Sequence, residues 1–249
     1  MPTWFIPHGG GPCFFMDWNP PDAWNKTADF LKGLASTLPA TPKAIVVISA
    51  HWLESTVSVT GSQYPDLIYD YSGFPSHTYE LKYPAEGNPS LAQQIVKALE
   101  LANIPAKVDH SRGFDHGVFI PMMLMFPKAD IPVVQLSLNS NLDPKAQLEI
   151  GKALESLRDE GVLLIGSGMS FHNMRGYGDP RFGPVSDEFD QWLTQAVEAS
   201  PEGRWTSLLN WAEAPSARLS HPPRQEEHLL PLMVVAGAAS RDIGRKVFS

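Results

Sequence analysis

The sequence predicts a single α/β domain over residues 1–249, with a central mostly parallel or mixed sheet flanked by helices. Strand-like apolar runs alternate with helical patterns, which is typical of sheets covered by helices on their faces. The chain has 249 residues, of which 43% are hydrophobic, enough to bury one large core. No internal repeat, low-complexity tract or linker divides it, so we expect one unit.

The first half of the chain contains two apolar runs followed by a long connection. The short run WFIP (residues 4–7) precedes AIVVIS (44–49), which is continuous and β-branched. Such runs are typical of strands that are covered on both faces. Residues 61–90 carry few periodic signals, so we expect an ordered loop there, held by packing.

A helix is predicted over residues 88–104, NPSLAQQIVKALELANI. Asn88 suits the N-cap and Pro89 the first helical position. Apolar residues then recur four apart on one face, at Leu91, Ile95 and Leu99.

The second half repeats the alternation. VVQLSL (133–138) and VLLIG (162–166) read as buried strands. Between them, DPKAQLEIGKALESL (143–157) opens with the same Asx-Pro signal and predicts a helix.

Three histidines follow apolar runs. His8 follows WFIP, His51 follows AIVVISA, and His172 follows VLLIGSGMSF. Ligands bind open α/β sheets at the C-terminal edge of the strands, so we expect a metal site at this edge. For each histidine taken alone, a hydrogen-bonded core or surface position is the alternative.

The glycines of HGGGP follow His8 directly. Glycine allows positive φ and close backbone approach, so this turn can leave the space beside His8 open. A glycine-rich turn without a ligand is the alternative. Neither G-x-G-x-x-G nor the Walker pattern is present, which disfavours a phosphate loop.

Two further segments place polar groups beside apolar stretches. Asp115 and His116 precede VFIPMMLMFP, and Glu226, Glu227 and His228 stand at the head of a predicted buried helix. Acidic residues also suit a helix N-terminus for electrostatic reasons, which is the alternative for the two glutamates.

Composition excludes several classes of partner. The net charge of −8 and the lack of a Lys/Arg run disfavour nucleic acid. Cys13 is the only cysteine, so neither an intramolecular disulfide nor a cysteine-based zinc site can form. No signal peptide or run of about 20 apolar residues is present, which excludes a membrane span. We expect a cytoplasmic protein acting on a small molecule.

Six segments together resemble the 4,5-DOPA extradiol dioxygenase family, within the class III ring-cleaving dioxygenases. They occur in order from residue 5 to about residue 238, and as a set they are highly specific: HGGGPCFFMDW, VVISAHW, YDYSGFPSHTYELKYPA, GFDHGVFIPMMLMFP, GSGMSFHNMR and HPPRQEEHLLPLMVVAGAA. The resemblance implies a non-haem Fe(II) enzyme that opens a catechol ring beside its hydroxyls and inserts both atoms of O2.

The resemblance also implies a ligand set. His8 and His51 match the first two metal ligands. Better-known relatives have a glutamate as the third, whereas the alignable position here is His228, with Glu227 adjacent as the second choice. Two histidines and a carboxylate are the usual set for Fe(II) activation of oxygen, so zinc is an alternative occupant.

The remaining histidines suit proton transfer. A catechol must lose protons to chelate a metal, and a base with a pKa near neutrality suits this step. His172 is our candidate base, with a fourth ligand as the alternative. His116 resembles the family's histidine that bonds substrate or oxygen, and Asp115 is expected to orient an imidazole.

Three residues are candidates for substrate binding. His221 belongs to the family motif, with loop shaping as its alternative role. Tyr79 is expected to close over the aromatic ring or to pack its own loop. Arg175 is expected to meet a substrate carboxylate or to pair with Asp179.

Two other functions remain open at this point. One is a zinc hydrolase in which Glu227 serves as base. The other is a non-catalytic relative that binds a protein partner. The identity of the catechol, the side of cleavage and the choice between monomer and small homo-oligomer are not fixed by the sequence.

Overall fold

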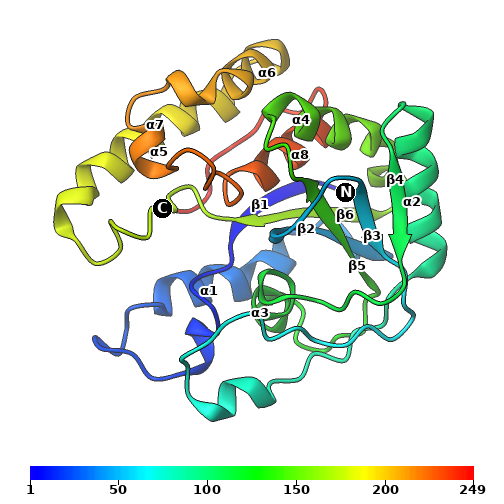
Figure 1. Cartoon of the computed structure of the whole chain (residues 1–249), viewed down its shortest axis with the longest axis horizontal. Coiled ribbons are helices and arrows are strands. Elements are labelled where there is room, and N and C mark those ends of the chain that lie inside the picture. The colour runs from blue at the N-terminus through cyan, green and yellow to red at the C-terminus, as the bar shows by residue number, and fades with distance from the viewer.

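A six-stranded sheet with the order β1-β6-β2-β5-β3-β4 forms the centre of the structure (Figure 1), a computed structural model that describes residues 1–249. β1, β6, β2 and β5 run parallel, β3 is antiparallel to β5, and β4 is parallel to β3. The predicted mixed sheet is therefore confirmed. The strands are β1 (Thr3–Pro7), β2 (Ala44–Glu54), β3 (Val57–Thr60), β4 (Ala106–Asp109), β5 (Val133–Asn139) and β6 (Val162–Gly168).

Eight α-helices cover the sheet. Figure 1 shows α1 and α3 on one side of it and α4 to α8 on the other, with α2 beside β4. The helices are α1 (Asn25–Leu34), α2 (Pro89–Leu101), α3 (His116–Met125), α4 (Pro144–Ala153), α5 (Gly183–Glu198), α6 (Pro201–Leu209), α7 (Ala217–Ser220) and α8 (Leu230–Ala238).

The two faces of the sheet explain why its strands are apolar without a break. Ile45 and Val47 of β2 pack toward α1 and α3, while Val46 and Ile48 pack toward α2, α4 and α8. Successive side chains of a strand point to opposite faces, so a strand covered on both sides needs apolar residues at every position.

The predicted helix starts are confirmed at α2 and α4. The Asn88 side chain accepts a hydrogen bond from the Leu91 N–H at 3.0 Å, and the Asp143 side chain accepts one from the Lys145 N–H at 3.0 Å. Each bond satisfies a donor of the first turn that has no partner within the helix.

β2 is longer than its sequence signal, which changes the position of His51. The strand continues to Glu54, and its register against β5 shifts between Ile48 and Leu53. His51 therefore lies within β2, at a bulge, and does not follow the strand as expected. A bulge re-aims a side chain at a sheet edge, and here it turns this imidazole toward the ends of β1 and β6.

The most apolar helices, α3 and α8, have 10 and 9 residues. No helix combines the length and hydrophobicity that crossing a bilayer requires.

Candidate metal centre

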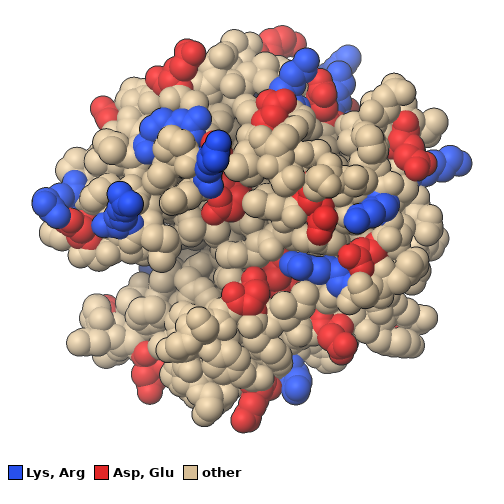
Figure 2. Space-filling model, viewed as in Figure 1, with Lys and Arg blue, Asp and Glu red and all other residues tan.

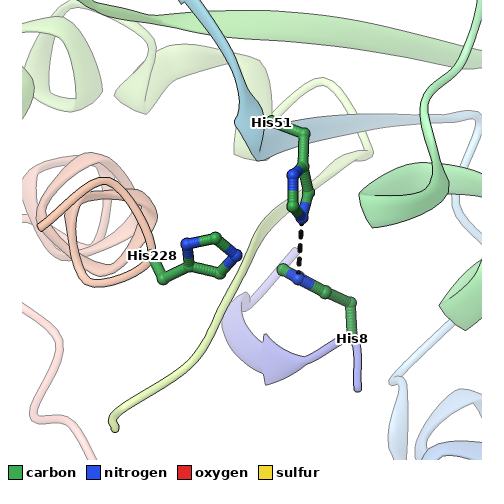
Figure 3. Close-up of side chains that lie close together, drawn as sticks. All are labelled: His8, His51 and His228. Carbon is green, nitrogen blue, oxygen red and sulfur yellow. Dashed lines mark hydrogen bonds between the residues drawn. The ribbon is translucent and has the colours of Figure 1, made fainter. Parts of the chain in front are cut away.

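Three histidines from distant parts of the chain meet where β1, β2 and β6 end. His8 directly follows β1, His51 lies at the bulge of β2, and His228 lies two residues before α8. Figure 3 shows a ring nitrogen of each pointing toward the other two. One potential ligand atom from each lies within 4.8 Å of the others, and the Nε2 atoms of His8 and His51 are 3.1 Å apart.

The end of β6 positions His228. The Met169 N–H donates to the His228 carbonyl at 2.9 Å. A Cβ atom on Gly168 would lie 2.1 Å from that carbonyl oxygen, so only glycine lets the two backbones approach so closely.

The glycine turn that follows His8 has a backbone that requires glycine. Gly9 and Gly11 have φ values of +80° and +55°, which favour glycine. A Cβ on Gly9 would meet the Cys13 Sγ at 2.3 Å, and one on Gly11 would meet the Phe74 ring at 2.9 Å. These two side chains therefore pack against the turn at the positions where any other residue would place its Cβ.

Hydrogen bonds on the far side of two of the rings, His8 and His228, define their tautomers. The Ser167 hydroxyl donates to the Gly117 carbonyl, so its oxygen accepts from His8 Nδ1 at 3.1 Å. His228 Nδ1 donates to Glu227 Oε1 at 3.0 Å. His51 Nδ1 faces Asp70 Oδ2 at 3.9 Å. With Nδ1 protonated in His8 and His228, Nε2 of these two rings carries the free lone pair, whereas the 3.9 Å distance at His51 is too long for a hydrogen bond.

Burial keeps these three imidazoles neutral. It lowers the pKa of His8 and His228 well below the ordinary value, and neighbouring imidazoles add to the effect. Burial, followed by the nearby His116, lowers the pKa of His51 to about 3. Neutral imidazole is the form that binds a metal ion.

The donor set fits a divalent transition metal. The Nε2 atoms of His8 and His51 lie 3.1 Å apart, so without an ion one of them must carry a proton, and a cation between them would let both offer a lone pair. Nitrogens bound at about 2.1 Å to one ion lie roughly 3.0 to 3.4 Å apart for coordination angles between 90° and 109°. Imidazole suits zinc and iron alike.

Glu227 lies behind His228, on its Nδ1 side. Its carboxylate forms a second group with His172 and His228, separate from the group formed by His8, His51 and His228. Neither Glu227 nor Glu226 caps the following helix, because α8 begins after Leu229 without a side-chain cap. Glu226 instead pairs with Arg218 at 3.0 Å.

His172 stacks on His228, with ring centroids 3.4 Å apart and planes 12° apart. Its Nδ1 lies 3.8 Å from Glu227 Oε1. Burial lowers the pKa of His172, and Glu227 opposes the shift. The neutral ring is therefore the main form at pH 7, and its buried Nδ1 has no hydrogen-bond partner.

His116 is the first residue of α3 and lies on the opposite side, with its ring centroid 3.9 Å from that of His51. Its Nδ1 donates to Asp70 Oδ1 at 2.8 Å. Sequence reasoning did not single out Asp70, although it lies within the quoted YDYSGFP segment. That segment has no regular periodicity, so nothing local distinguished this carboxylate from any other loop aspartate.

Asp115 does not orient an imidazole, contrary to expectation. Its carboxylate accepts from the side chains of Ser49, Gln135 and Arg112. Ser49 Oγ in turn accepts from the backbone N–H of His51 at 3.1 Å. Asp115 therefore supports the bulge that presents His51.

The three expected substrate residues have different surroundings. The Tyr79 hydroxyl donates to the Tyr71 carbonyl at 3.5 Å, and its ring packs near Tyr69 and Tyr71, so it packs its own loop. Arg175 is exposed. Its expected partner Asp179 is instead bound by Arg181.

His221 is fully buried and supports the loop that carries His172. Its Nε2 donates to the Ser170 carbonyl at 2.8 Å, and its ring packs against Phe189 and Trp211. The His172 N–H donates to the Ser220 carbonyl at 3.0 Å, so a backbone hydrogen bond also joins the His172 loop to the segment that carries His221. The structure therefore favours loop shaping over substrate contact for His221.

Acid is expected to destabilise the protein partly through His221. Burial lowers the pKa of His221 to about 4. If Nδ1 were also protonated, its N–H would have no acceptor in the structure. Below about pH 6.5 the unfolded chain binds a proton there that the native state does not, so the free energy of unfolding falls as the pH falls toward 4. Between pH 7 and pH 5 the free energy of unfolding should fall by about 2 kcal/mol less in His221→Gln than in wild type. Urea unfolding of both metal-free proteins at the two pH values measures this difference, and parallel pH dependences would contradict it.

The surface around the metal centre is hollowed. Figure 2 shows a hollow at the left of the molecule, where β1, β6 and β2 end in Figure 1, and its visible walls are mostly uncharged. Lysine and arginine are interspersed with acidic residues elsewhere on this face, without the basic stripe of a nucleic-acid site. A separate cavity of about 430 Å³ between α1, α5 and residues 244–249 is lined by none of the site histidines.

Comparisons with known proteins agree in family and in fold. The family model for the catalytic LigB subunit of aromatic ring-opening dioxygenase matches residues 2–249. The chain is 40% identical to a 4,5-DOPA dioxygenase extradiol from Beta vulgaris, over 96% of this chain and 87% of that protein. It is 39% identical to the dioxygenase tasH from Hapsidospora irregularis, over 97% of this chain and 79% of the relative. The crystal structure of an uncharacterized protein, JW3007, from Escherichia coli K12 superposes with a TM-score of 0.74 at 34% identity, covering 96% and 88% of the two chains.

Proposed function

The chain belongs to the LigB family of aromatic ring-opening dioxygenases and is an extradiol ring-opening enzyme; on this premise we propose that its substrate is a small DOPA-like catechol and its working metal Fe(II). The named relatives support a catecholic substrate, since several are 4,5-DOPA extradiol dioxygenases. Both atoms of O2 enter the product, and the ring carbon–carbon bond beside one hydroxyl breaks.

We assign His8, His51 and His228 as the residues that hold the metal. The observation that carries this assignment is the convergence of three neutral imidazoles, His8 and His228 buried and His51 half-buried, with the Nε2 atoms of His8 and His51 3.1 Å apart. When bound, ferrous iron supplies the redox chemistry that activates O2 toward the catecholate. Three protein ligands leave coordination positions for substrate, and Zn(II) competes for the same nitrogens.

His172 is the proposed general base. The Glu227 carboxylate faces its Nδ1, so Nε2 is the nitrogen available to take a catechol proton. Stacking on His228 places this ring beside the metal group without including it in the three-nitrogen set. By accepting this proton, His172 would convert the catechol to the catecholate, the form in which both oxygens could serve as ligands if a metal were bound.

His116 faces the substrate from the opposite side. Its Nδ1 is occupied by Asp70, so its Nε2 accepts a hydrogen bond from substrate or, once protonated, donates one. The two flanking imidazoles therefore give the site one proton-transfer group on each side of the metal ligands.

Anaerobic reconstitution of the metal-free protein with Fe(II) or Zn(II) tests the proposed function. Oxygen uptake and the visible spectrum are then recorded on addition of L-DOPA, caffeate or protocatechuate. We expect oxygen uptake and a yellow ring-fission product with Fe(II) and neither with Zn(II). No oxygen uptake with any of the catechols, together with tight stoichiometric zinc, would contradict the proposal and favour the hydrolase or the binding protein.

A further inference from the structure

Asp70 lies on the long connection between β3 and α2, a segment with little regular structure. The connection is held in place beside the start of α3. The Ile68 N–H donates to the Phe114 carbonyl at 2.7 Å, and the Phe114 N–H donates to the Asp66 carbonyl at 2.8 Å. These two bonds fix the backbone two to four residues before Asp70, so the position of its side chain follows from the fold.

The Asp70 carboxylate serves two histidines and one helix end. Its Oδ1 accepts from both the backbone N–H and the Nδ1 of His116, at 2.9 and 2.8 Å. Its Oδ2 lies 3.9 Å from His51 Nδ1. Asp115, at the N-cap position of α3, makes no capping bond because its carboxylate points inward, so Asp70 supplies the missing acceptor from another part of the chain.

The same relation recurs on the other side of the metal centre. Glu227 lies 3.0 Å from Nδ1 of His228 and 3.8 Å from Nδ1 of His172. Each carboxylate therefore faces one proposed ligand and one proposed proton-transfer imidazole. Asp70 hydrogen-bonds to the proposed proton-transfer imidazole, His116, whereas Glu227 hydrogen-bonds to the proposed metal ligand, His228.

We propose that Asp70 is a positioning residue of the ring-opening reaction, which holds His116 in the tautomer and orientation that direct its Nε2 toward the substrate. The inference rests on the proposed function, because the role of His116 toward the substrate is part of that proposal. A carboxylate hydrogen-bonded to Nδ1 fixes both the tautomer and the ring rotation of a histidine. Without such a partner, the ring can change tautomer and rotate. The backbone bond to His116 adds a second constraint, since ring and main chain share one acceptor atom.

Asp70→Ala and Asp70→Asn separate positioning from charge. The asparagine amide oxygen still accepts from both donors of His116, whereas alanine offers no acceptor. We expect Asp70→Ala to lower kcat about 10- to 50-fold with KM changed less than about 2-fold, a magnitude typical of lost outer-sphere partners. Asp70→Asn should retain kcat within about 5-fold of wild type. Asp66→Asn, an exposed neighbour on the same loop, is the matched control and should behave as wild type.

A second readout needs neither metal nor turnover. ¹⁵N-histidine NMR of the metal-free protein should show His116 protonated at Nδ1 in wild type and Asp70→Asn, and a tautomer mixture in Asp70→Ala. An unchanged tautomer in Asp70→Ala, or equal losses of kcat in both variants, would overturn the proposal. Failure of the wild type to cleave any catechol would instead overturn the proposed function, and the NMR signal would still decide whether Asp70 orients His116.

Discussion

The His228→Ala protein is expected to bind Fe(II) more weakly by more than about 100-fold and to show no catechol-dependent oxygen uptake above background. Even the loss of a residue that only supports a ligand typically costs 10- to 100-fold in metal affinity, and His228 offers a nitrogen to the metal group itself. Competition with a chromophoric chelator measures the affinity, and an oxygen electrode measures uptake.

His110→Ala is the control for this experiment, because His110 is exposed and lies outside the metal group. Its metal affinity and activity should equal those of wild type. A Glu227→Gln variant run in parallel decides between the two candidates for the third ligand. If Glu227→Gln lost the metal while His228→Ala kept it, the assignment of His228 would be wrong.

His172→Ala is expected to keep one metal ion per chain and to lose kcat by about 10²- to 10⁴-fold, the range for removal of a general base. The ring stacks beside the ligands but its nitrogens do not belong to the three-histidine group. Metal content after gel filtration and steady-state oxygen uptake at saturating catechol measure the two quantities. Adding catechol at higher pH should partly restore the rate, since the deprotonated substrate then needs no base.

The control for this second experiment is Met174→Ala, at an exposed position on the same loop. It should leave both metal content and kcat unchanged. Loss of the metal together with kcat in His172→Ala would show that His172 is a further ligand and would remove it as the base.

Five of the strands and helices were predictable because each carries its signal locally. Continuous branched runs predicted β2, β5 and β6, and the Asx-Pro openings predicted α2 and α4 with their capping bonds. The bulge in β2 was not predictable in this way. It depends on the register of β2 against β5 and on Ser49, which Asp115 holds from another element.

Within the site, the sequence indicated which histidines matter but not all of their partners. His8, His51 and His172 were found because they follow apolar runs that end at one sheet edge, and His228 through its motif. Asp70 was missed and Asp115 was given the wrong partner. Asp115 directly precedes α3, and Asp70 contacts its first residue. Only the packing of the loop against α3 decides which of the two carboxylates faces an imidazole.

By itself, then, the sequence determined the α/β class, the edge of the sheet that carries the site, and the imidazole character of the donors. These properties follow from the order of apolar runs and from residue types, which act over a few positions. The tertiary structure alone decided which ring nitrogen of His8 and His228 is free, that Glu227 lies behind His228, and that Cys13 and Phe74 pack against the glycine turn. Those features depend on contacts between residues far apart in the chain, where a difference of about 1 Å decides whether a hydrogen bond forms.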